Sequence, residues 1–222
     1  MSQELWSAVD DYVTGQLMAS DPVLDETIRS SAAAGLPSIA VSPAQGKLLH
    51  LLARLCAARR ILELGTLGGY SAIWLARALP PDGRLITLEY QEKHARIARA
   101  NLAQAGLADR VEVIVGPALQ TLPRLEGDAG GPFDLFFIDA DKANNANYFA
   151  WAMKLSHPGS VIIVDNVVRK GAVADAGSPD ADVRGVRRCI EAMGKQRRFD
   201  ATVIQTVGSK GYDGFAIGVV SA

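Results

Sequence analysis

The sequence predicts an α/β fold with a doubly wound, mostly parallel sheet of seven strands and helices on both of its faces. Short apolar segments alternate with helical segments between residues 61 and 164, which is the pattern of a parallel sheet. These apolar segments contain few polar positions, as expected when helices cover both faces. The last two segments, 201–207 and 215–220, are joined by turn residues and are therefore expected to pair antiparallel.

The first part of the chain is expected to be helical before the sheet begins. Residues 1 to about 36 have helical character, and Asp21-Pro22 divides them into two helices. Ser42 then acts as an N-cap, followed by a proline at the first helical position and by Gln45, which completes a capping box. The helix that follows is predicted to run to about Ala58 and to bury leucines at helical spacing, namely Leu48, Leu51, Leu52 and Leu55.

The remaining elements follow from the same alternation and from the glycines and prolines between segments. Strands are expected at 61–64, 85–88, 111–115, 133–138 and 160–164. Helices are expected at 70–79, 91–105, 118–125, 144–155 and 182–194, with a loop at 169–180. Turn residues at 208–214 separate the last two strands. No repeat or linker interrupts the pattern, so residues 1–222 are interpreted as a single domain.

Composition excludes several classes of function. The formal net charge is −1 and no basic face is indicated, which argues against a nucleic-acid partner. No apolar stretch approaches the roughly 20 residues that a membrane span needs, and the first residues lack the pattern of a signal peptide. Cys56 and Cys189 are interpreted as small buried hydrophobes in a reducing compartment. We therefore expect a cytoplasmic protein without a membrane partner.

Ionisable side chains follow the predicted strands at the edge where an open parallel sheet binds small ligands. The glycines after the first strand lack the G-x-G-x-x-G spacing of a pyrophosphate cradle, although they permit a tight turn. Glu89, at the end of the second strand, is positioned to accept hydrogen bonds from ribose hydroxyls. Glu63 lies inside an apolar strand, where a carboxylate is costly unless a cationic ligand pairs with it.

Two later strands end in acids that predict a metal site. Asp139 and Asp165 end strands that are possible neighbours, and Asn166 follows directly. Two carboxylates and an amide oxygen suit Mg²⁺, Mn²⁺ or Ca²⁺, whereas zinc prefers the histidine or cysteine that these strand ends lack. Lys142 is a candidate base, because a desolvated lysine beside a cation loses its proton near neutral pH. The alternative is a surface salt bridge between Lys142 and Asp141.

Four segments resemble a known family: ILELGTLGGYS, GPALQTLP, FDLFFIDADK and VIIVDNVV are similar to segments of the metal-dependent, S-adenosylmethionine-using O-methyltransferases. That family includes catechol and caffeoyl-CoA O-methyltransferases, and the resemblance covers roughly residues 36 to 220. It implies a Rossmann-like fold with an antiparallel last strand, and a homodimer. It also implies that the helices of residues 1–36 contribute to a substrate lid and to the subunit contact.

The resemblance implies a role for each matching residue at the cofactor. Glu63 faces the amino group of the methionine part, Ser71 binds its carboxylate at a helix start, and Glu89 holds the ribose hydroxyls. Val41 packs near the methionine end and Ala118 touches the adenine. The other residues expected at the cofactor are Gly65, Thr66, Leu67, Gly69, Tyr90, Asp139 and Asp141.

The resemblance also implies the chemistry. Asp139, Asp165 and Asn166 match the metal ligands, with Mg²⁺ as the expected ion and Ca²⁺ or Mn²⁺ as alternatives. The ion binds neighbouring oxygens of a catechol-like phenolic substrate, Lys142 removes a proton, and the phenolate attacks the sulfonium methyl group. The chain departs from plant relatives near the substrate mouth, where Asn145 replaces a tyrosine, although the later Tyr148 fits.

A second departure is Arg169, which replaces a tryptophan and makes a coenzyme A thioester a doubtful substrate. Arg169 is interpreted as a solvated loop residue or, alternatively, as a contact for a substrate carboxylate.

Three other functions are considered. An NAD-dependent oxidoreductase explains the glycine turn and Glu89 but leaves Asp139, Asp165 and Asn166 without a role. A nucleic-acid methyltransferase commonly carries Asn/Asp-Pro-Pro-Tyr after the fourth strand, where this chain has Asp-Ala-Asp-Lys. A binding module without catalysis does not explain why every implied catalytic group is present. The histidines, His50, His94 and His157, are expected to lie away from the strand ends.

Overall fold

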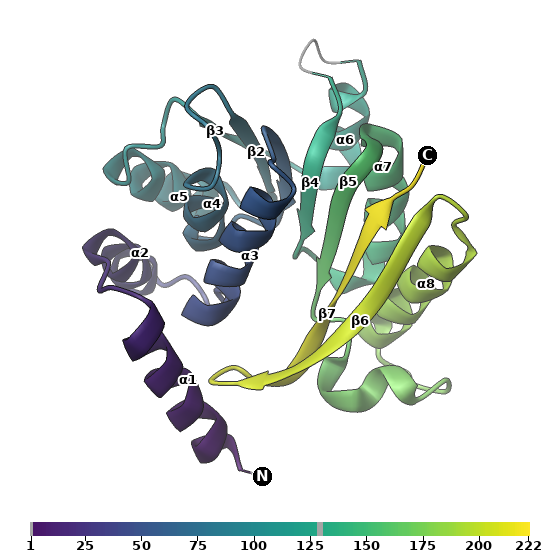
Figure 1. Ribbon diagram of the computed structural model, residues 1–222, viewed down its shortest axis with the longest axis horizontal. Helices are drawn as coiled ribbons and strands as arrows, with labels where there is room; N and C mark the ends of the chain where they lie inside the picture. Colours follow the sequence, from purple (N-terminus) through teal and green to yellow (C-terminus); the bar gives the residue numbers. More distant parts are fainter. Residues whose placement is uncertain (1, 128–130) are drawn as a thin grey trace.

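The computed structural model describes residues 2–127 and 131–222, so Met1 of the first predicted helix lies outside the described residues. Seven strands form one sheet in the order β3-β2-β1-β4-β5-β7-β6 (Figure 1). Their bounds are β1 (Arg60–Leu64), β2 (Arg84–Glu89), β3 (Val111–Val115), β4 (Phe133–Ile138), β5 (Ser156–Asp165), β6 (Phe199–Gly208) and β7 (Gly211–Val220).

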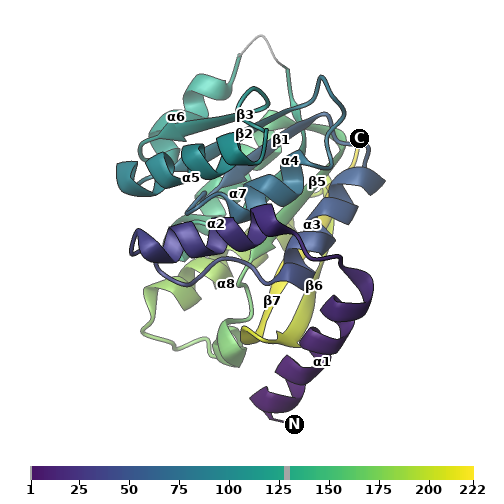
Figure 2. The same cartoon turned by 90° about the vertical axis from the view of Figure 1, so that its left-hand side faces the viewer.

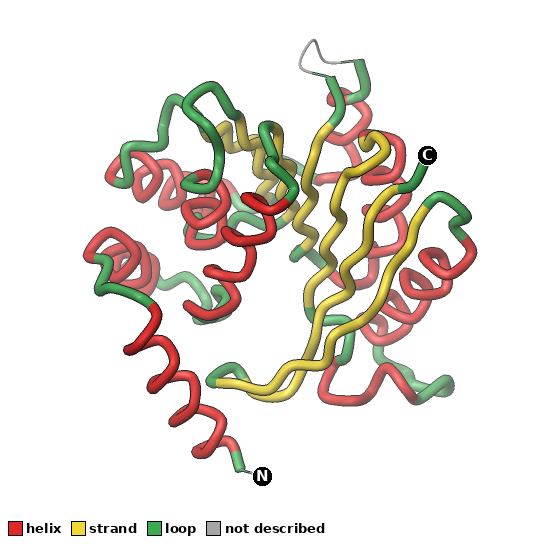
Figure 3. Tube along the Cα trace, in the orientation of Figure 1, coloured by secondary structure: helices red, strands yellow, loops and turns green. Residues whose placement is uncertain are grey.

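Strands β1 to β5 are parallel to one another, so their carboxyl ends meet at one edge of the sheet. β4 and β5 are adjacent, which confirms that Asp139 and Asp165 belong to neighbouring strand ends. Asp139 directly follows β4, and Asp165 is the last residue of β5. The predicted antiparallel hairpin is also confirmed, since β7 pairs antiparallel with both β5 and β6 (Figure 3). Its turn is shorter than expected: Gly208 pairs with Gly211, and only Ser209 and Lys210 lie between the strands.

Helices cover both faces of the sheet, as predicted (Figure 1). One face packs against α3 (Pro43–Leu55), α4 (Tyr70–Ala76) and α5 (Glu92–Gln104) through a buried cluster that includes Leu49, Ile73 and Leu102. The other face packs against α6 (Ala118–Leu125), α7 (Asn145–Leu155) and α8 (Ala181–Lys195) through a second cluster. Two short 3-10 helices, η1 (Lys142–Asn144) and η2 (Arg169–Ala174), follow β4 and β5 and carry residues of the ligand edge.

The N-terminal segment forms two helices, α1 (Gln3–Leu17) and α2 (Pro22–Ala33), divided at the predicted position. Asp21 caps α2, and its carboxylate also pairs with Arg77, which directly follows α4. α1 lies beside the tip of the β6–β7 hairpin (Figure 2), where Gln3 donates to the Gly208 carbonyl at 2.8 Å and Asp10 accepts from the Ser209 N–H at 2.7 Å.

Three details of the predicted helices and strands are wrong. The buried residues of α3 are Gly46, Leu49 and Ala53, whereas Leu51 and Leu55 are exposed, the latter by 81 %. The Ser42 side chain caps the Gln45 N–H as predicted, but the Gln45 side chain turns away from the cap toward Asp165, so no reciprocal box forms.

The third difference concerns β5, which begins at Ser156 rather than at Ser160 and so includes His157, a residue expected in a loop. The His157 ring contacts a carboxylate oxygen of Asp134 at 2.9 Å, and its backbone N–H donates to Ser160, which together hold the start of the strand. Among the described residues, no helix is both long enough and apolar enough to cross a bilayer.

Candidate active site

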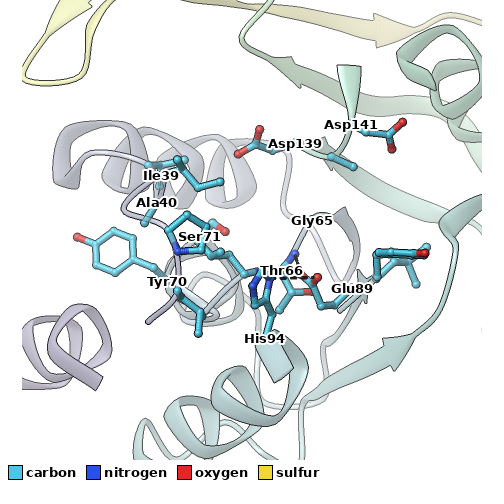
Figure 4. A pocket seen from close by; sticks show the side chains of 18 of the residues that line it. Ile39, Ala40, Gly65, Thr66, Tyr70, Ser71, Glu89, His94, Asp139 and Asp141 are labelled. Carbon is cyan, nitrogen blue, oxygen red and sulfur yellow. Dashed lines mark hydrogen bonds and ion pairs between the residues drawn. The ribbon is translucent and has the colours of Figure 1, made fainter. Parts of the chain in front are cut away.

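A cavity of about 880 Å³ opens at the carboxyl ends of the parallel strands (Figure 4). Its walls come from the ends of β1, β2, β3 and β4, from η1 and η2, and from α2 with the segment that follows it. Most of the predicted site residues line it: Val41, Gly65, Thr66, Leu67, Ser71, Glu89, Tyr90, Ala118, Asp139, Asp141, Lys142 and Asn166. Three predicted residues, Glu63, Gly69 and Asp165, are not among the residues that line it.

The glycine turn after β1 is shaped by close contact with the next strand. Gly65 has a φ of +99°, and a Cβ at this position would lie 2.1 Å from the backbone carbonyl oxygen of Asp139. Only glycine permits both the left-handed conformation and this approach. The turn therefore places the backbone of Gly65 directly against the start of the acidic segment that follows β4.

Glu89 is held rigidly at the end of β2. One of its carboxylate oxygens accepts hydrogen bonds from the backbone N–H groups of Leu67 at 2.8 Å and Thr66 at 3.3 Å. The other accepts from Gln91 N–H at 2.8 Å and lies 3.4 Å from Nδ1 of His94. Figure 4 shows Glu89, Thr66 and His94 grouped on one side of the cavity. The expectation that His94 lies away from the strand ends is therefore wrong.

Glu63 is fully buried beneath the glycine turn. Its Oε2 accepts a hydrogen bond of 2.6 Å from the Thr87 hydroxyl, while Oε1 has no hydrogen-bond partner among the described residues. Burial raises the pKa of Glu63 to about 7, because desolvation penalises the charged form. An unsatisfied buried carboxylate oxygen is costly, and a cationic group at this position would relieve that cost.

The acids after β4 and β5 form one group with Lys142. The Lys142 amine donates a hydrogen bond of 2.6 Å to Oδ1 of Asp139, and the lysine is only 7 % exposed. Burial and the nearby charge of Asp139 raise the pKa of Asp165 to about 7, because both disfavour a second negative charge at this position. The alternative of a salt bridge between Lys142 and Asp141 is wrong, because the lysine pairs with Asp139 instead.

Asp141 is turned to a different set of partners. It accepts hydrogen bonds from the Tyr148 hydroxyl and from the Asn144 amide, the latter at 2.6 Å. Burial and the Asp141 charge both raise the pKa of Tyr148, which keeps its hydroxyl protonated as a donor. Asp139 and Asp141 lie near each other in Figure 4 but have separate hydrogen-bond partners.

The donor set fits a hard divalent cation. Among the described residues, no three side chains of the types His, Cys, Asp and Glu gather in one place, so a cation held by Asp139 and Asp165 would need the Asn166 amide as a third protein ligand. Both oxygens of Asp165 are oriented, Oδ2 by the Gln45 amide at 2.7 Å and Oδ1 by the Asn166 N–H at 2.8 Å. Oriented carboxylates with an amide oxygen suit Mg²⁺, Ca²⁺ or Mn²⁺.

Sequence reasoning missed Gln45 and His94 at this site. For His94 a signal was present, since it follows Glu89 by five positions, in the first turns of the helix after β2. No local signal marks Gln45, because its partner Asp165 is distant in the sequence. Of the two departures from plant relatives, Arg169 lines the cavity as expected. Asn145 is buried and is not among the lining residues.

Comparisons with known proteins agree on the family. The model of the O-methyltransferase family matches residues 16–212. A Mycobacterium tuberculosis protein named catechol O-methyltransferase is 58 % identical over 96 % of this chain and 94 % of its own length.

Solved structures give the same result. An O-methyltransferase from Bacillus cereus in complex with SAH (S-adenosylhomocysteine) superposes with a TM-score of 0.98 at 55 % identity, covering 99 % of this chain and 100 % of the other. The O-methyltransferase TomG from Streptomyces achromogenes, in complex with SAM (S-adenosylmethionine), gives a TM-score of 0.97 at 53 % identity with complete coverage of both chains, 100 % each. These matches show that the chain belongs to the S-adenosylmethionine-dependent O-methyltransferase family.

Proposed function

We propose that this methyltransferase transfers a methyl group from S-adenosylmethionine to one hydroxyl of a catechol-like small molecule. The observation that carries the proposal is the buried Lys142 amine, which lies 2.6 Å from Asp139 on the same cavity wall as Asn166. This arrangement supports a base and a set of oxygen ligands beside the acceptor hydroxyl. The relative named catechol O-methyltransferase supports the same class of acceptor.

Asp139, Asp165 and Asn166 would hold a divalent cation, with Mg²⁺ as our first choice. A bound cation lowers the pKa of a neighbouring phenolic hydroxyl and favours two adjacent oxygens over one. This preference is the reason for assigning catechols rather than simple phenols as acceptors.

The protein's own residues supply binding, orientation and proton transfer. The unpartnered oxygen of Glu63 pairs with the ammonium group of the methionine part, and Glu89, fixed by three backbone N–H groups, accepts from the ribose hydroxyls. Lys142, in its neutral amine form, takes the proton of the acceptor hydroxyl at Nζ. Since the methyl donor is already activated, alignment in a cavity shielded from water provides most of the remaining rate enhancement.

We further propose that the chain works as one domain in which the segment after α1 closes the cavity. Ile28 and Ala32 of α2 and the residues from Leu36 to Val41 line the cavity, which supports a lid role for this part of residues 1–36 and the loop beyond it. A homodimer is supported by apolar side chains exposed on α3 and on the edge strand β6, namely Leu51, Leu55, Val203, Ile204 and Val207. Both cysteines are free thiols, which fits a cytoplasmic location.

The test is a panel of catechols and hydroxycinnamates assayed with S-adenosylmethionine, with and without EDTA. Methylation is expected for compounds with adjacent hydroxyls and is expected to stop on chelation and resume with added Mg²⁺. Methylation that survives complete chelation would refute the cation, and equal turnover of a phenol with a single hydroxyl would refute the catechol assignment. Calorimetry tests the oxidoreductase alternative. That alternative requires the protein to bind NAD and to show no binding of S-adenosylmethionine.

A further inference from the structure

Arg169 occupies a fixed position at the mouth of the cavity. It lies three residues beyond Asn166 and lines the same cavity as Asn166 and Lys142. Its side chain is 29 % exposed, less than expected for a freely solvated loop arginine. One guanidinium nitrogen lies 3.3 Å from a carboxylate oxygen of Asp182, a residue in the first turn of α8 that also lines the cavity.

The backbone around Arg169 is strained and firmly held. Asn166, Arg169 and Lys170 have φ values of 56°, 55° and 55°, a left-handed conformation that costs residues other than glycine roughly 1 kcal/mol or more each. Such a conformation persists only where neighbouring structure enforces it. Here the enforcing group is Asp213 of β7, which has one carboxylate oxygen accepting from three backbone N–H groups.

Those three N–H groups belong to Val168 at 3.0 Å, Arg169 at 2.9 Å and Gly214 at 2.9 Å. Asp213 therefore anchors the Arg169 backbone to the sheet, within the same loop that carries Asn166. This anchored backbone holds Arg169 at the wall of the cavity, where its side chain is able to meet a bound ligand.

The guanidinium retains capacity for a ligand. Arginine has five N–H donors, and the hydrogen bonds formed within the described residues use only the one that reaches Asp182. The Asp182 side chain is 43 % exposed, so its attraction for Arg169 is weakened by water. A carboxylate on a bound ligand can therefore engage the free donors of the fork, and two parallel hydrogen bonds are the preferred geometry for that pairing.

We propose that Arg169 makes this enzyme selective for catechols that carry a carboxylate on the part of the ring remote from the two hydroxyls. The inference rests on the proposed function, because Lys142 and Asn166 define where the hydroxyls lie and Arg169 defines where the substituent lies. Asp182 moderates the selectivity by competing for the same guanidinium.

The experiment compares protocatechuate with its neutral carboxamide, which has nearly the same shape and keeps both hydroxyls. The wild-type enzyme is expected to show a kcat/KM at least tenfold higher for the carboxylate, mostly through KM. Arg169→Met is expected to remove at least tenfold of this preference, with a much smaller loss of kcat/KM for the carboxamide, whose oxygen accepts only neutral hydrogen bonds from the guanidinium. Arg169→Lys is expected to restore part of the preference, because it keeps the charge but not the fork.

Asp182→Asn serves as the matched variant, since it frees the guanidinium without altering Arg169. It is expected to raise the preference for the carboxylate, and added salt is expected to lower that preference in both enzymes. Affinity for SAH, measured by calorimetry, reports whether each variant retains a folded cofactor site.

Equal kcat/KM of the wild-type enzyme for the two compounds would overturn the inference. So would equal losses on both compounds in Arg169→Met while SAH binding is retained, since that result indicates a structural role. If neither compound nor any other catechol is methylated although S-adenosylmethionine binds, the proposed function itself is wrong and the inference falls with it.

Discussion

The Gln45 amide donates a hydrogen bond of 2.7 Å to Oδ2 of Asp165, joining the first turn of α3 to the end of β5. The second oxygen of the same carboxylate accepts from the Asn166 N–H, so both oxygens of Asp165 are oriented before any ligand arrives. Residues that orient a ligating carboxylate in this way affect metal affinity although they do not touch the metal.

We therefore expect Gln45→Met to weaken binding of Mg²⁺ or Mn²⁺ by about 10-fold or more, in the range found for such outer partners of metal ligands. Calorimetric titration of the metal, without substrate, measures the effect. Gln104→Met, at the exposed end of α5, is the control and is expected to leave metal affinity unchanged. Unchanged affinity in Gln45→Met would show that the hydrogen bond does not order Asp165.

Lys142→Met is expected to lower turnover by about 10²-fold to 10⁴-fold, the usual contribution of a positioned acid or base. Affinity for SAH is expected to stay within a factor of about two, because Lys142 itself is not among the residues assigned to the cofactor. Single-turnover kinetics and calorimetry separate the two effects. Lys195→Met, at the exposed end of α8, provides a control for loss of a positive charge. A variant that keeps full turnover would exclude Lys142 as the base.

The raised pKa of Glu63, about 7 in the ligand-free protein, predicts a pH dependence of cofactor binding. A cationic ammonium group favours the ionised carboxylate, so below pH 7 binding must first release a proton. Affinity for SAH should therefore fall as the pH drops from 7, with a limiting slope of tenfold per unit, and Glu63→Gln should bind weakly with no such slope. Calorimetry of metal-free protein in buffers of different ionisation enthalpy detects the released proton.

The same carboxyl group should reduce the stability of the ligand-free protein. Its folded pKa lies above the usual value of 4.5, so between pH 4.5 and 7 the unfolded chain ionises more readily than the folded one. Glu63→Gln, which can still accept from Thr87, is expected to raise the melting temperature well above pH 7 and to leave it unchanged below pH 4.5. Thermal melts at the two extremes test the sign, and equal shifts at both would contradict it.

Gly185 gives a test of how α8 supports the lysine. A Cβ at Gly185 would lie 2.2 Å from the carbonyl oxygen of Lys142 and 2.6 Å from the Cα of Ala143, which are backbone atoms that cannot move aside cheaply. Gly185→Ala should cost about 1–3 kcal/mol in unfolding free energy and reduce turnover by displacing η1. Gly194→Ala on the same helix, where nothing lies within 4 Å, should instead stabilise by about 0.5–1 kcal/mol. Urea unfolding compares the pair.

The pair of His157 and Asp134 should stabilise the fold only at acidic to neutral pH. The hydrogen bond to Asp134 raises the pKa of His157 above its usual 6.5, so its contribution is complete below 6.5 and disappears as the pH rises through the higher folded value. Because the His157 side chain is 38 % exposed, water limits the gain to about 1 kcal/mol or less. Urea unfolding of His157→Gln should show a loss near pH 5.5 and none near pH 9, and a loss that is equal at both would point to packing instead.

Much of the fold was predictable because its signals are local. The bounds of β3, β4 and α6 match the expected ranges, since each apolar run stops at a glycine, proline or charged residue. The start of β5 was not predictable, because Pro158 and Gly159 normally indicate a loop and it is contacts with Asp134 and Ser160 that extend the strand. The exposure of Leu55 was also not predictable, since helical spacing does not show which apolar face of a helix packs inward.

At the site, the strand ends made the ligand-binding edge of the sheet predictable. The hydrogen-bond partners of each side chain at that edge were not predictable. Position at the carboxyl end of a parallel strand is a property of the sequence pattern, and it brought Glu89, Asp139 and Asn166 to one cavity. The pairing of Lys142 with Asp139 rather than Asp141 depends on the tight turn at η1, where Asp141 is taken by Tyr148 and Asn144. Such choices between adjacent acids depend on backbone direction, which residue types alone do not specify.

The close approach of Gly65 to the Asp139 carbonyl constrains any attempt to redesign this enzyme. A side chain introduced at the turn to accommodate a modified methyl donor would push on the segment that carries the acid and the lysine, so donor analogues and catalysis cannot be tuned separately there. Another part of the cavity rim is formed by Arg169 of η2 and Asp182 of α8, which pair with each other. Libraries that aim to broaden the acceptor range should therefore begin at that rim and leave the glycine turn intact.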